Sequence, residues 1–492
     1  MPYLVDQTPS SWKVSRFLVI WIIGLILLTT GCAVGPDFRK PQPAVPAAYS
    51  GLGPVAASQT GKTTSQPAQL VEWWKIFNDP TLTSLVGRAI ESNLDLRQAT
   101  SRIRQARAMR GMAASGLWPA INVGASYTRS QGSESTGGGG LSSGSGSVQN
   151  LFQTGLDAAW ELDIFGGTRR GVEAAQADVQ TAVEDRRDIL VSLIAEVGTD
   201  YVGLRGYQQQ IIVNQKNLTA QKHTAEITRK RYEAGFVTGL DVANAAAQAA
   251  TTESLIPVLE SLAQGTIYNL SVLLGREPAA LAEELSGEKP LPTTPPEVPV
   301  GLPSDLLRRR PDIRRAEAVI HATTARIGVA TADLFPKFSL TGSFGLMSST
   351  FSPLGNWSSR FWSYGPSVTW PIFDAGRIRW NIEVQNAVQE QALLAYEKAV
   401  LTALKDVETA LVAYTKEQQH LRLLTEAVRN NSKAVELSRK LYVAGKTDFL
   451  NVLNAERSLN ASEDAQVQST RALSTNLIAL YKALGGGWES AQ

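Results

Sequence analysis

The pattern of hydrophobic and polar positions is most regular between Arg377 and Ala444, a stretch of 68 residues that contains neither proline nor glycine. Both residue types break helices, and globular helices usually end within about 20 residues. The stretch therefore predicts one unusually long helix, roughly 100 Å at about 1.5 Å per residue. Gly445 ends it, and a second helical run returns from about Phe449 to Leu484. A largely apolar seam recurs about every 3.5 residues, the period of a coiled coil. Its positions are Val400, Leu404, Val407, Leu411, Tyr414, Gln418, Leu421, Thr425, Val428, Ser432, Val435, Arg439 and Tyr442.

Two other regions alternate strictly between apolar and polar residues, which predicts strands. The first pair is Ile121–Thr128 and Phe152–Asp163, separated by the Gly/Ser-rich segment Gly132–Ser147. The second pair is Phe338–Leu346 and Trp362–Ile372. In both predicted hairpins one face is apolar, with aromatic residues near the strand ends, and the other face is small and polar.

Further helices are predicted before and after the first hairpin. One extends over Asp79–Gly116, where Asp79 can cap the helix and the following proline suits its first turn. Another covers about Thr168–Tyr232. After a turn at Glu233–Gly239, a return helix continues to about Leu274, interrupted or kinked by Pro257.

The second half of the chain repeats the first. Asp95–Tyr127 matches Asp312–Phe344 at a constant offset of 217, and the long and return helices match at an offset of 210, which aligns Tyr232 with Tyr442. Each half thus comprises a helix, two strands, a long helix and a return helix. We predict a first structural repeat at 70–275, a Pro-rich linker at 276–303, a second repeat at 304–485 and a C-terminal tail at 486–492.

The N-terminus has the features of a signal peptide, predicted at 1–31. Lys13 and Arg16 precede the 12-residue, almost wholly apolar run Phe17–Leu28, which is too short for a membrane span. Small residues then lead to Cys32, as in a bacterial lipobox, although Thr29 replaces the usual branched apolar residue. We expect an acylated Cys32 at the head of an extended, Pro-rich tether, 32–69; the alternative is a cleaved signal followed by an incidental cysteine.

Composition argues against several classes of protein. Charged residues are 19% of the 492 and the net charge is +2, so no basic excess suggests nucleic acid as a partner. The single cysteine excludes a disulfide framework and a multi-cysteine metal site. The three histidines are more readily interpreted as solvated or packed residues than as ligands, and no catalytic Ser/His/Asp arrangement is present. We therefore expect no enzyme activity, no metal and no cofactor other than the lipid on Cys32.

Strands with one apolar and one polar face are typical of a membrane β-barrel around a watery lumen, or of soluble hairpins that pack on helices. The signal peptide and lipobox favour the barrel. Four strands cannot close a barrel, and open edges are not tolerated in lipid, so several chains would have to complete it.

Short segments along the whole mature chain together form a recognisable set: Gly31–Phe38, Trp73–Trp74, Asp79–Pro80, Ile164–Gly167, Leu306–Arg314, Ile372–Gly376, Tyr232–Gly235, Tyr442–Gly445 and Ala455–Leu459. With these segments the chain resembles the TolC-like outer-membrane efflux factors, specifically the lipoprotein branch found in tripartite multidrug pumps. The resemblance implies a mainly α fold with a membrane β portion, in which duplicated helical hairpins form a periplasmic α-barrel and four strands per protomer contribute to a trimeric, 12-stranded β-barrel. It also implies a homotrimer in the cell outer membrane, working with a periplasmic adaptor and an inner-membrane transporter.

The same resemblance points to candidate gate residues at the periplasmic tip. Asp241 and Tyr442 match positions where relatives form a closing hydrogen bond between tip turns, with the carboxylate as acceptor; the alternative is a helix cap and a core tyrosine. Relatives often place aspartates where this chain has Asn451 and Asn454, so we expect weaker cation selectivity at the aperture, unless Asp448 substitutes.

Three functions remain open from the sequence. The leading prediction is a passive exit duct for small toxic compounds, and the alternatives are a type I protein secretion duct and a non-transporting envelope stalk or adhesin. Polar strand faces favour a conduit over a stalk. The arginine-rich segment Leu306–Arg314 is more readily interpreted as a structural element than as an anion-binding site, because Asp312 can pair with its arginines.

Overall fold

The computed structural model describes residues 33–50, 62–64, 70–131, 148–292, 297–299 and 303–491. The predicted signal peptide and Cys32 lie outside the described residues. The chain divides into two compact units, each built from three stretches of sequence. Unit 1 comprises Met1–Pro41, Arg104–Thr181 and Glu317–Ala395; unit 2 comprises Gln42–Ile103, Ala182–Ala316 and Tyr396–Gln492.

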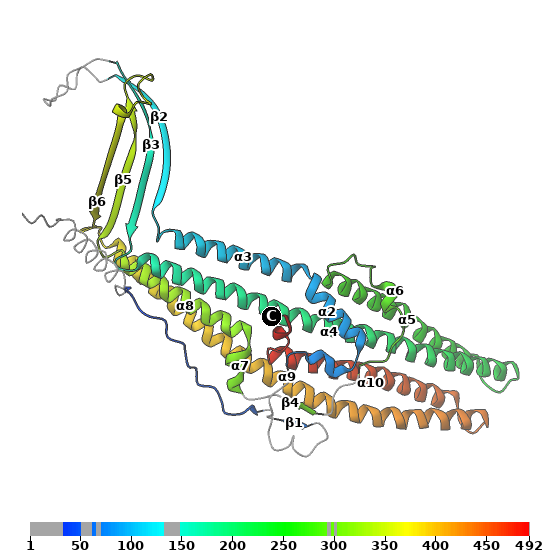
Figure 1. Ribbon diagram of the computed structural model, residues 1–492. Helices are drawn as coiled ribbons and strands as arrows, with labels where there is room; N and C mark the ends of the chain where they lie inside the picture. Colours follow the sequence, from blue (N-terminus) through cyan, green and yellow to red (C-terminus); the bar gives the residue numbers. More distant parts are fainter. Residues whose placement is uncertain are drawn as a thin grey trace, which may run out of the picture. The chain divides into compact units, whose positions relative to one another are not determined.

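The helices follow the predicted duplication closely (Figure 1). Each of three helices in the first half has a counterpart of equal length in the second, at the offsets of 217 and 210 residues seen in the sequence. The pairs are α3 (Leu94–Ser115) with α8 (Pro311–Ala332), α4 (Gly167–Glu233) with α9 (Arg377–Val443), and α5 (Gly239–Leu273) with α10 (Phe449–Ala483). The shorter elements are α2 (Pro80–Ser92), α6 (Ala282–Leu285), α7 (Pro303–Arg309), η3 (Trp73–Phe77), η4 (Trp357–Ser359) and η5 (Trp488–Ala491).

The structure corrects one helix prediction and narrows another. The helix expected over Asp79–Gly116 is broken at Asn93, whose amide nitrogen donates to Leu273 O at 2.9 Å while its amide oxygen accepts from Leu96 N at 3.0 Å. Asn93 therefore caps a new helix and fixes it to α5. Of the two outcomes expected at Pro257, an interruption or a kink, the interruption is excluded, because α5 continues through this residue.

The four predicted strands form one antiparallel sheet in unit 1, in the order β2-β3-β5-β6. The outer strands β2 and β6 each leave one edge without a partner strand in the described sheet. Trp370 and Ile372, expected in the last strand, lie beyond its end. The strands are β2 (Ala120–Gln131), β3 (Val148–Leu162), β5 (Lys337–Ser348) and β6 (Arg360–Thr369); a separate short parallel pair joins β1 (Lys62–Thr64) and β4 (Glu297–Pro299).

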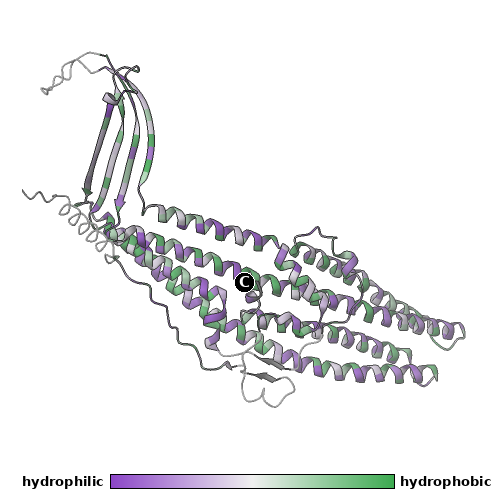
Figure 2. Ribbon diagram, in the orientation of Figure 1, coloured by the Kyte–Doolittle hydropathy of each residue, from purple (hydrophilic) through white to green (hydrophobic). Residues whose placement is uncertain are grey.

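The register of the sheet collects the apolar residues of all four strands on one face. Figure 2 shows that hydrophobic and hydrophilic residues are interspersed along these strands. Val123 lies opposite Leu156, which lies opposite Phe344, which in turn lies opposite Trp362. This face is exposed in the protomer, with Val123 at 79% and Trp362 at 65% of their maximal accessibility. An apolar sheet face left uncovered in water would be costly, so its natural surroundings must be apolar.

Glycines allow the strands of the sheet to approach closely on the polar face. Gly155 pairs with Gly345, and a Cβ added to Gly345 would lie 2.4 Å from Thr154 O and 2.8 Å from the Phe361 ring. Gly124 continues the row, but a Cβ there would meet nothing within 4 Å. Close approach is thus required between β3 and β5 and not at β2.

Unit 2 packs its helices along the predicted coiled-coil seam. Its buried members include Val400, Val407, Leu411, Tyr414, Val435 and Tyr442. Trp73 of η3 is buried, and its indole stacks on Tyr481 of α10 with ring centroids 5.5 Å apart.

The arginine cluster of Leu306–Arg314 is structural, as the sequence favoured. Arg310 holds Asp312 at 2.7 Å and donates to Ala483 O at 2.9 Å, which joins α8 to the end of α10. Arg314 contacts the fully buried Glu184 at 2.9 Å. The Trp488 ring lies under the guanidinium of Arg314 at 5.3 Å.

Candidate functional site

The polar face of the sheet is the first candidate for a functional surface. Small hydroxyl and glycine residues dominate it, and Ser343 Oγ bonds Ser363 Oγ across β5 and β6 at 2.7 Å. Asp157 lies on this face opposite Ser343 and Asn122. A face of this kind suits contact with water, whereas the opposite face suits contact with lipid.

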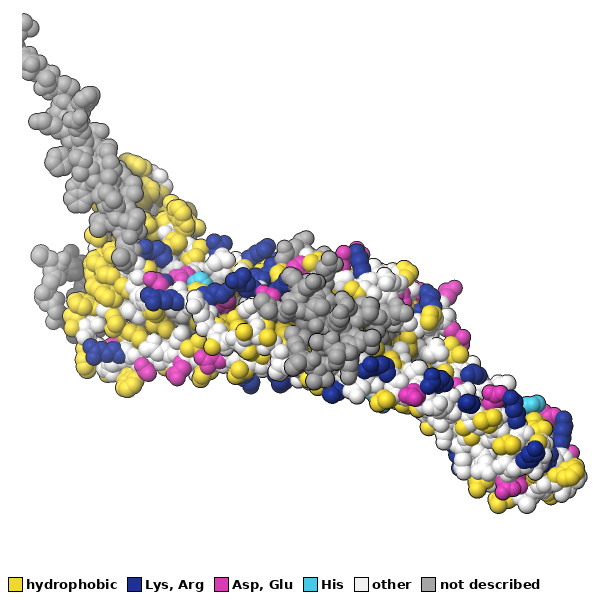
Figure 3. Space-filling view, turned by 90° about the horizontal axis from the view of Figure 1, so that it is seen from below, with side chains coloured by type: hydrophobic (Ala, Val, Ile, Leu, Met, Phe, Trp, Pro, Cys, Tyr) yellow, Lys and Arg dark blue, Asp and Glu magenta, His cyan; other side chains and the backbone are white. Residues whose placement is uncertain are grey.

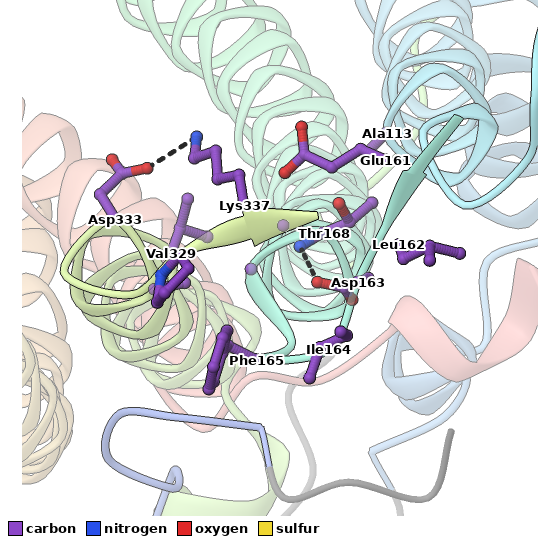
Figure 4. A pocket seen from close by; sticks show the side chains of 14 residues that line it. Ala113, Glu161, Leu162, Asp163, Ile164, Phe165, Thr168, Val329, Asp333 and Lys337 are labelled. Carbon is purple, nitrogen blue, oxygen red and sulfur yellow. Dashed lines mark hydrogen bonds and ion pairs between the residues drawn. The ribbon is translucent and has the colours of Figure 1, made fainter. Parts of the chain in front are cut away.

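The corner where β3 meets α4 is held by Asp163 (Figure 4). Its carboxylate accepts from Thr168 N at 3.0 Å and from Arg169 N at 2.8 Å, which satisfies two backbone donors at the start of α4. A cavity of about 370 Å³ adjoins this corner. Lys337 of β5 and Asp333 both line this cavity and form an ion pair at 3.0 Å, so these two charges neutralise each other.

The first described residues, 33–40, are bound to unit 1. Arg170, almost fully buried, donates to Val34 O at 3.2 Å and to Asp37 Oδ1 at 2.6 Å. The Phe38 ring stacks on His321 at 4.5 Å, and Lys40 pairs with Glu317 at 2.9 Å. We call residues 33–40 the strap.

Three glycines from separate segments make room for the strap. Gly35 adopts a φ of +93°, and a Cβ on it would lie 2.4 Å from Gly328 Cα. A Cβ on Gly166 would lie 2.6 Å from Ala33 Cβ. In the sequence, Gly35 was identified only as one residue of a segment that resembles the family. Its close contact with α8 could be seen only in the structure.

At the helical tip, Tyr442 and Asp241 each have a partner other than the predicted one. Tyr442 is 3% exposed, packs on Phe449 with ring centroids 5.7 Å apart, and donates its hydroxyl to Thr228 Oγ1 at 3.3 Å. Asp241 accepts from Thr238 N at 3.0 Å, in a reciprocal capping box at the start of α5. The Asp241–Tyr442 bond is therefore not formed within the protomer, and a bond in the assembled protein stays a prediction.

Two tip contacts were not predicted. Arg231 of α4 places its guanidinium 4.5 Å above the Tyr442 ring and donates to the Tyr442 carbonyl. Glu456 of α10, 4% exposed, is bound by Arg439 of α9 and by Thr224 of α4. The sequence offered one indirect signal, since Arg439 is a charged residue at a position of the largely apolar seam.

The aperture candidates lie together on α10 and the turn before it. Asp448 is the N-cap residue of α10, and Asn451 and Asn454 follow on an exposed face of the helix. The Asn451 amide donates to Thr447 Oγ1 at 2.8 Å. All three residues are exposed, which is compatible with lining a water-filled aperture. That role stays a prediction.

The helical surface carries mixed charges. Figure 3 shows acidic and basic side chains interspersed along the helices, with no large area of one sign on this face. None of the described helices has an apolar stretch long enough to cross a membrane. Among the described residues, no group of three or more His, Cys, Asp or Glu side chains is arranged to hold a metal ion.

Comparison with known proteins decides the family. The family model described as "Outer membrane efflux protein" matches residues 85–276 and 302–486, one segment in each half of the duplication. The chain belongs to the outer membrane efflux protein family. The resemblance inferred from the sequence is confirmed, and so are the mainly helical, internally duplicated fold, the outer-membrane location and the role in efflux.

Several members of the outer membrane efflux protein family match along nearly the whole chain. The pyoverdine export outer membrane protein OpmQ of Pseudomonas aeruginosa is 33% identical, over 87% of this chain and 89% of its own. The toluene efflux pump outer membrane protein TtgF of Pseudomonas putida is 30% identical, over 95% and 96%. The solved structure of the outer-membrane channel OprN superposes with a TM-score of 0.85 at 38% identity, over 93% of this chain and all of that one.

Proposed function

We propose that this outer membrane efflux protein works as a homotrimeric exit duct, whose barrel takes four strands from each protomer. One observation carries the proposal: a sheet with an exposed apolar face and two unpaired edges, β2 and β6. Unpaired strand edges cannot persist in lipid, so the β6 edge of one protomer must pair with the β2 edge of another. The polar faces then line a watery lumen.

The partners and the cargo follow from the family. The duct receives small toxic compounds from an inner-membrane transporter through a periplasmic adaptor, and no catalytic step occurs in it. Relatives named for pyoverdine and for toluene share this scaffold, which supports a passive duct whose cargo is selected elsewhere. An acyl chain on Cys32 anchors the N-terminus in the outer membrane, next to the strap.

The periplasmic aperture would be lined by Asp448, Asn451 and Asn454 of the three copies. Rings of carboxylates attract cations, and amides do so weakly. Replacing Asn454 with aspartate should therefore raise the cation-to-anion permeability ratio in planar bilayers, while Asn454→Ala should leave it nearly unchanged. A strong cation preference that Asn454→Ala abolishes would contradict this assignment.

Two measurements test the duct itself. The mature protein in mild detergent should be a trimer by light scattering and should form pores after reconstitution; a monomer without pores would refute the proposal. A deletion strain should become hypersensitive to drugs and retain secretion of its proteins. A secretion defect alone would favour the protein secretion duct, and neither phenotype would favour a stalk or adhesin.

A further inference from the structure

Two helical hairpins meet at the tip of each protomer, one from each repeat. The first consists of α4, the turn 234–238 and α5, and the second of α9, the turn 444–448 and α10. Tyr442 lies at their junction, in a buried cluster that includes Ala245 from the first hairpin and Phe449, Val452 and Leu453 from the second. What joins the hairpins here determines how readily they can separate.

Arg231 provides a polar link at this junction. Its guanidinium stacks on the Tyr442 ring at 4.5 Å, donates through Nη1 to the Tyr442 carbonyl, and lies 3.5 Å from the Val443 carbonyl. These are among the last carbonyls of α9, which have no partner within the helix, and a cation at a helix C-terminus is electrostatically favourable. One side chain of α4 thus caps α9 and covers the tyrosine ring at once.

The Tyr442 carbonyl is shared between two donors. Gly445 N donates to it at 2.9 Å from the turn that ends α9, with a φ of +69° at the glycine. Arg231 uses the remaining lone pair from the other hairpin. The conformation of the second tip turn is therefore tied directly to α4.

The duplication shows that this link is specific to one repeat. The residue equivalent to Arg231 in the second repeat, at the offset of 210, is Leu441, and the equivalent of Tyr442 is Tyr232, which is 51% exposed. An arginine over a buried tyrosine thus joins the hairpins within a protomer, with no counterpart at the other tip turn.

Resting on the duct function proposed above, we propose that Arg231 is the residue that clamps the two hairpin tips of each protomer together, and that separation of the tips requires its release from Tyr442. Arg231 is a positioning residue: it holds the second tip turn and touches no cargo. The clamp acts on the ring and carbonyl of Tyr442, whereas a hydrogen-bond latch to Asp241 would act on the hydroxyl. The two models therefore predict different results for Tyr442→Phe.

The test compares the resting conductance of the full-length lipidated protein and its variants in planar bilayers. Arg231→Met should raise the open fraction about fivefold or more, the low end of typical coupling between sites. Arg231→Lys, which keeps the cation, should restore part of the closure. Lys230→Met, an exposed neighbour paired with Glu226 at 2.8 Å, should stay within about twofold of wild type. Tyr442→Phe keeps the ring and carbonyl and loses only the hydroxyl bond to Thr228 Oγ1, so it should leak less than Arg231→Met.

The outcomes separate the possibilities. Arg231→Met that behaves like Lys230→Met overturns the clamp, and leakage in Tyr442→Phe and Asp241→Asn equal to that of Arg231→Met supports the latch instead. A wild-type protein that forms no pore refutes the duct and not the clamp. If Arg231→Met assembles poorly, amide hydrogen exchange of residues 440–449 is measured in Arg231→Lys and Arg231→Gln instead. We expect these residues to exchange faster in both variants than in Lys230→Met. Equal exchange rates overturn the clamp.

Discussion

Arg439 donates two hydrogen bonds to one oxygen of Glu456, from Nε at 3.0 Å and from Nη2 at 2.7 Å, and Thr224 Oγ1 donates to the same oxygen at 3.0 Å. The ion pair thus joins α9, α10 and α4. Its two ends differ in burial: the Glu456 side chain is 5% exposed and that of Arg439 36%. Removal of Arg439 and removal of Glu456 should therefore change the stability of the protein by different amounts.

Arg439→Met should destabilise the protein by roughly 3 kcal/mol, because it leaves a buried carboxylate without a cation. Glu456→Gln should cost less, about 1–2 kcal/mol, since the freed guanidinium can reach water. Chemical denaturation of the detergent-solubilised protein measures both. Lys440→Met, which removes an exposed pair with Glu436, is the control and should change stability by less than about 0.5 kcal/mol. Equal losses for the three variants would contradict a buried three-helix link.

Gly345→Ala should weaken the sheet, because its new Cβ would lie 2.4 Å from Thr154 O, on backbone that cannot move away. Overpacking of this kind typically costs about 1–3 kcal/mol. The effect should appear as loss of the heat-resistant oligomer on electrophoresis. Gly124→Ala, in the same row and on the same face, has open space and should behave like wild type. Equal behaviour of the two variants would show that close approach of β3 and β5 is not required.

Arg170→Met should release the strap, because the guanidinium that holds Val34 and Asp37 is lost. Trypsin can then cut after Arg39, whereas Lys40 is followed by proline and resists cleavage. We expect cleavage there to be at least about tenfold faster, since hydrogen bonds to charged groups contribute about 1.5–3 kcal/mol each. Arg326→Met, which removes an ion pair with Asp178 in the same unit, should leave the cleavage rate unchanged. A protected strap in Arg170→Met would mean that the remaining contacts suffice.

Asp200 makes the stability of the helical unit depend on pH. Burial, together with the neighbouring Glu196 carboxylate, raises the pKa of Asp200 to about 6 from its ordinary value of 3.8. The folded state thus favours the neutral acid, and the stabilisation present below pH 3.8 is lost as the pH rises through about 6. Asp200→Asn should therefore have a higher Tm than wild type at pH 8 and the same Tm at pH 4. A Tm difference that does not vary between pH 4 and pH 8 would contradict the shift.

The boundaries of the long helices could be predicted from the sequence to within about two residues. Glycines at the two tip turns mark the ends of α4 and α9, and neither glycine nor proline occurs within α9 or α10. The break at Asn93 was missed. Asparagine is an ordinary residue within a helical pattern, and its amide finds Leu273 of α5, 180 positions along the chain, only in the folded protein.

At the helical tip, too, the sequence identified a residue but not its partners. Tyr442 was identified from the family resemblance, but its partners within the protomer, Thr228 and Arg231, were not predicted. A bond between residues hundreds of positions apart depends on how two helices rotate about their axes. A rotation of one residue, about 100°, exchanges one face of a helix for another.

By itself the sequence determined the duplication, the element types and the family, because these depend on local periodicity and on short segments that each carry their own pattern. Only the tertiary structure decided which edges of the sheet remain open, which glycines accept the strap, and that Arg231 rather than Asp241 contacts Tyr442. These are relationships between distant segments, fixed by close packing of surfaces whose partners a linear pattern does not identify.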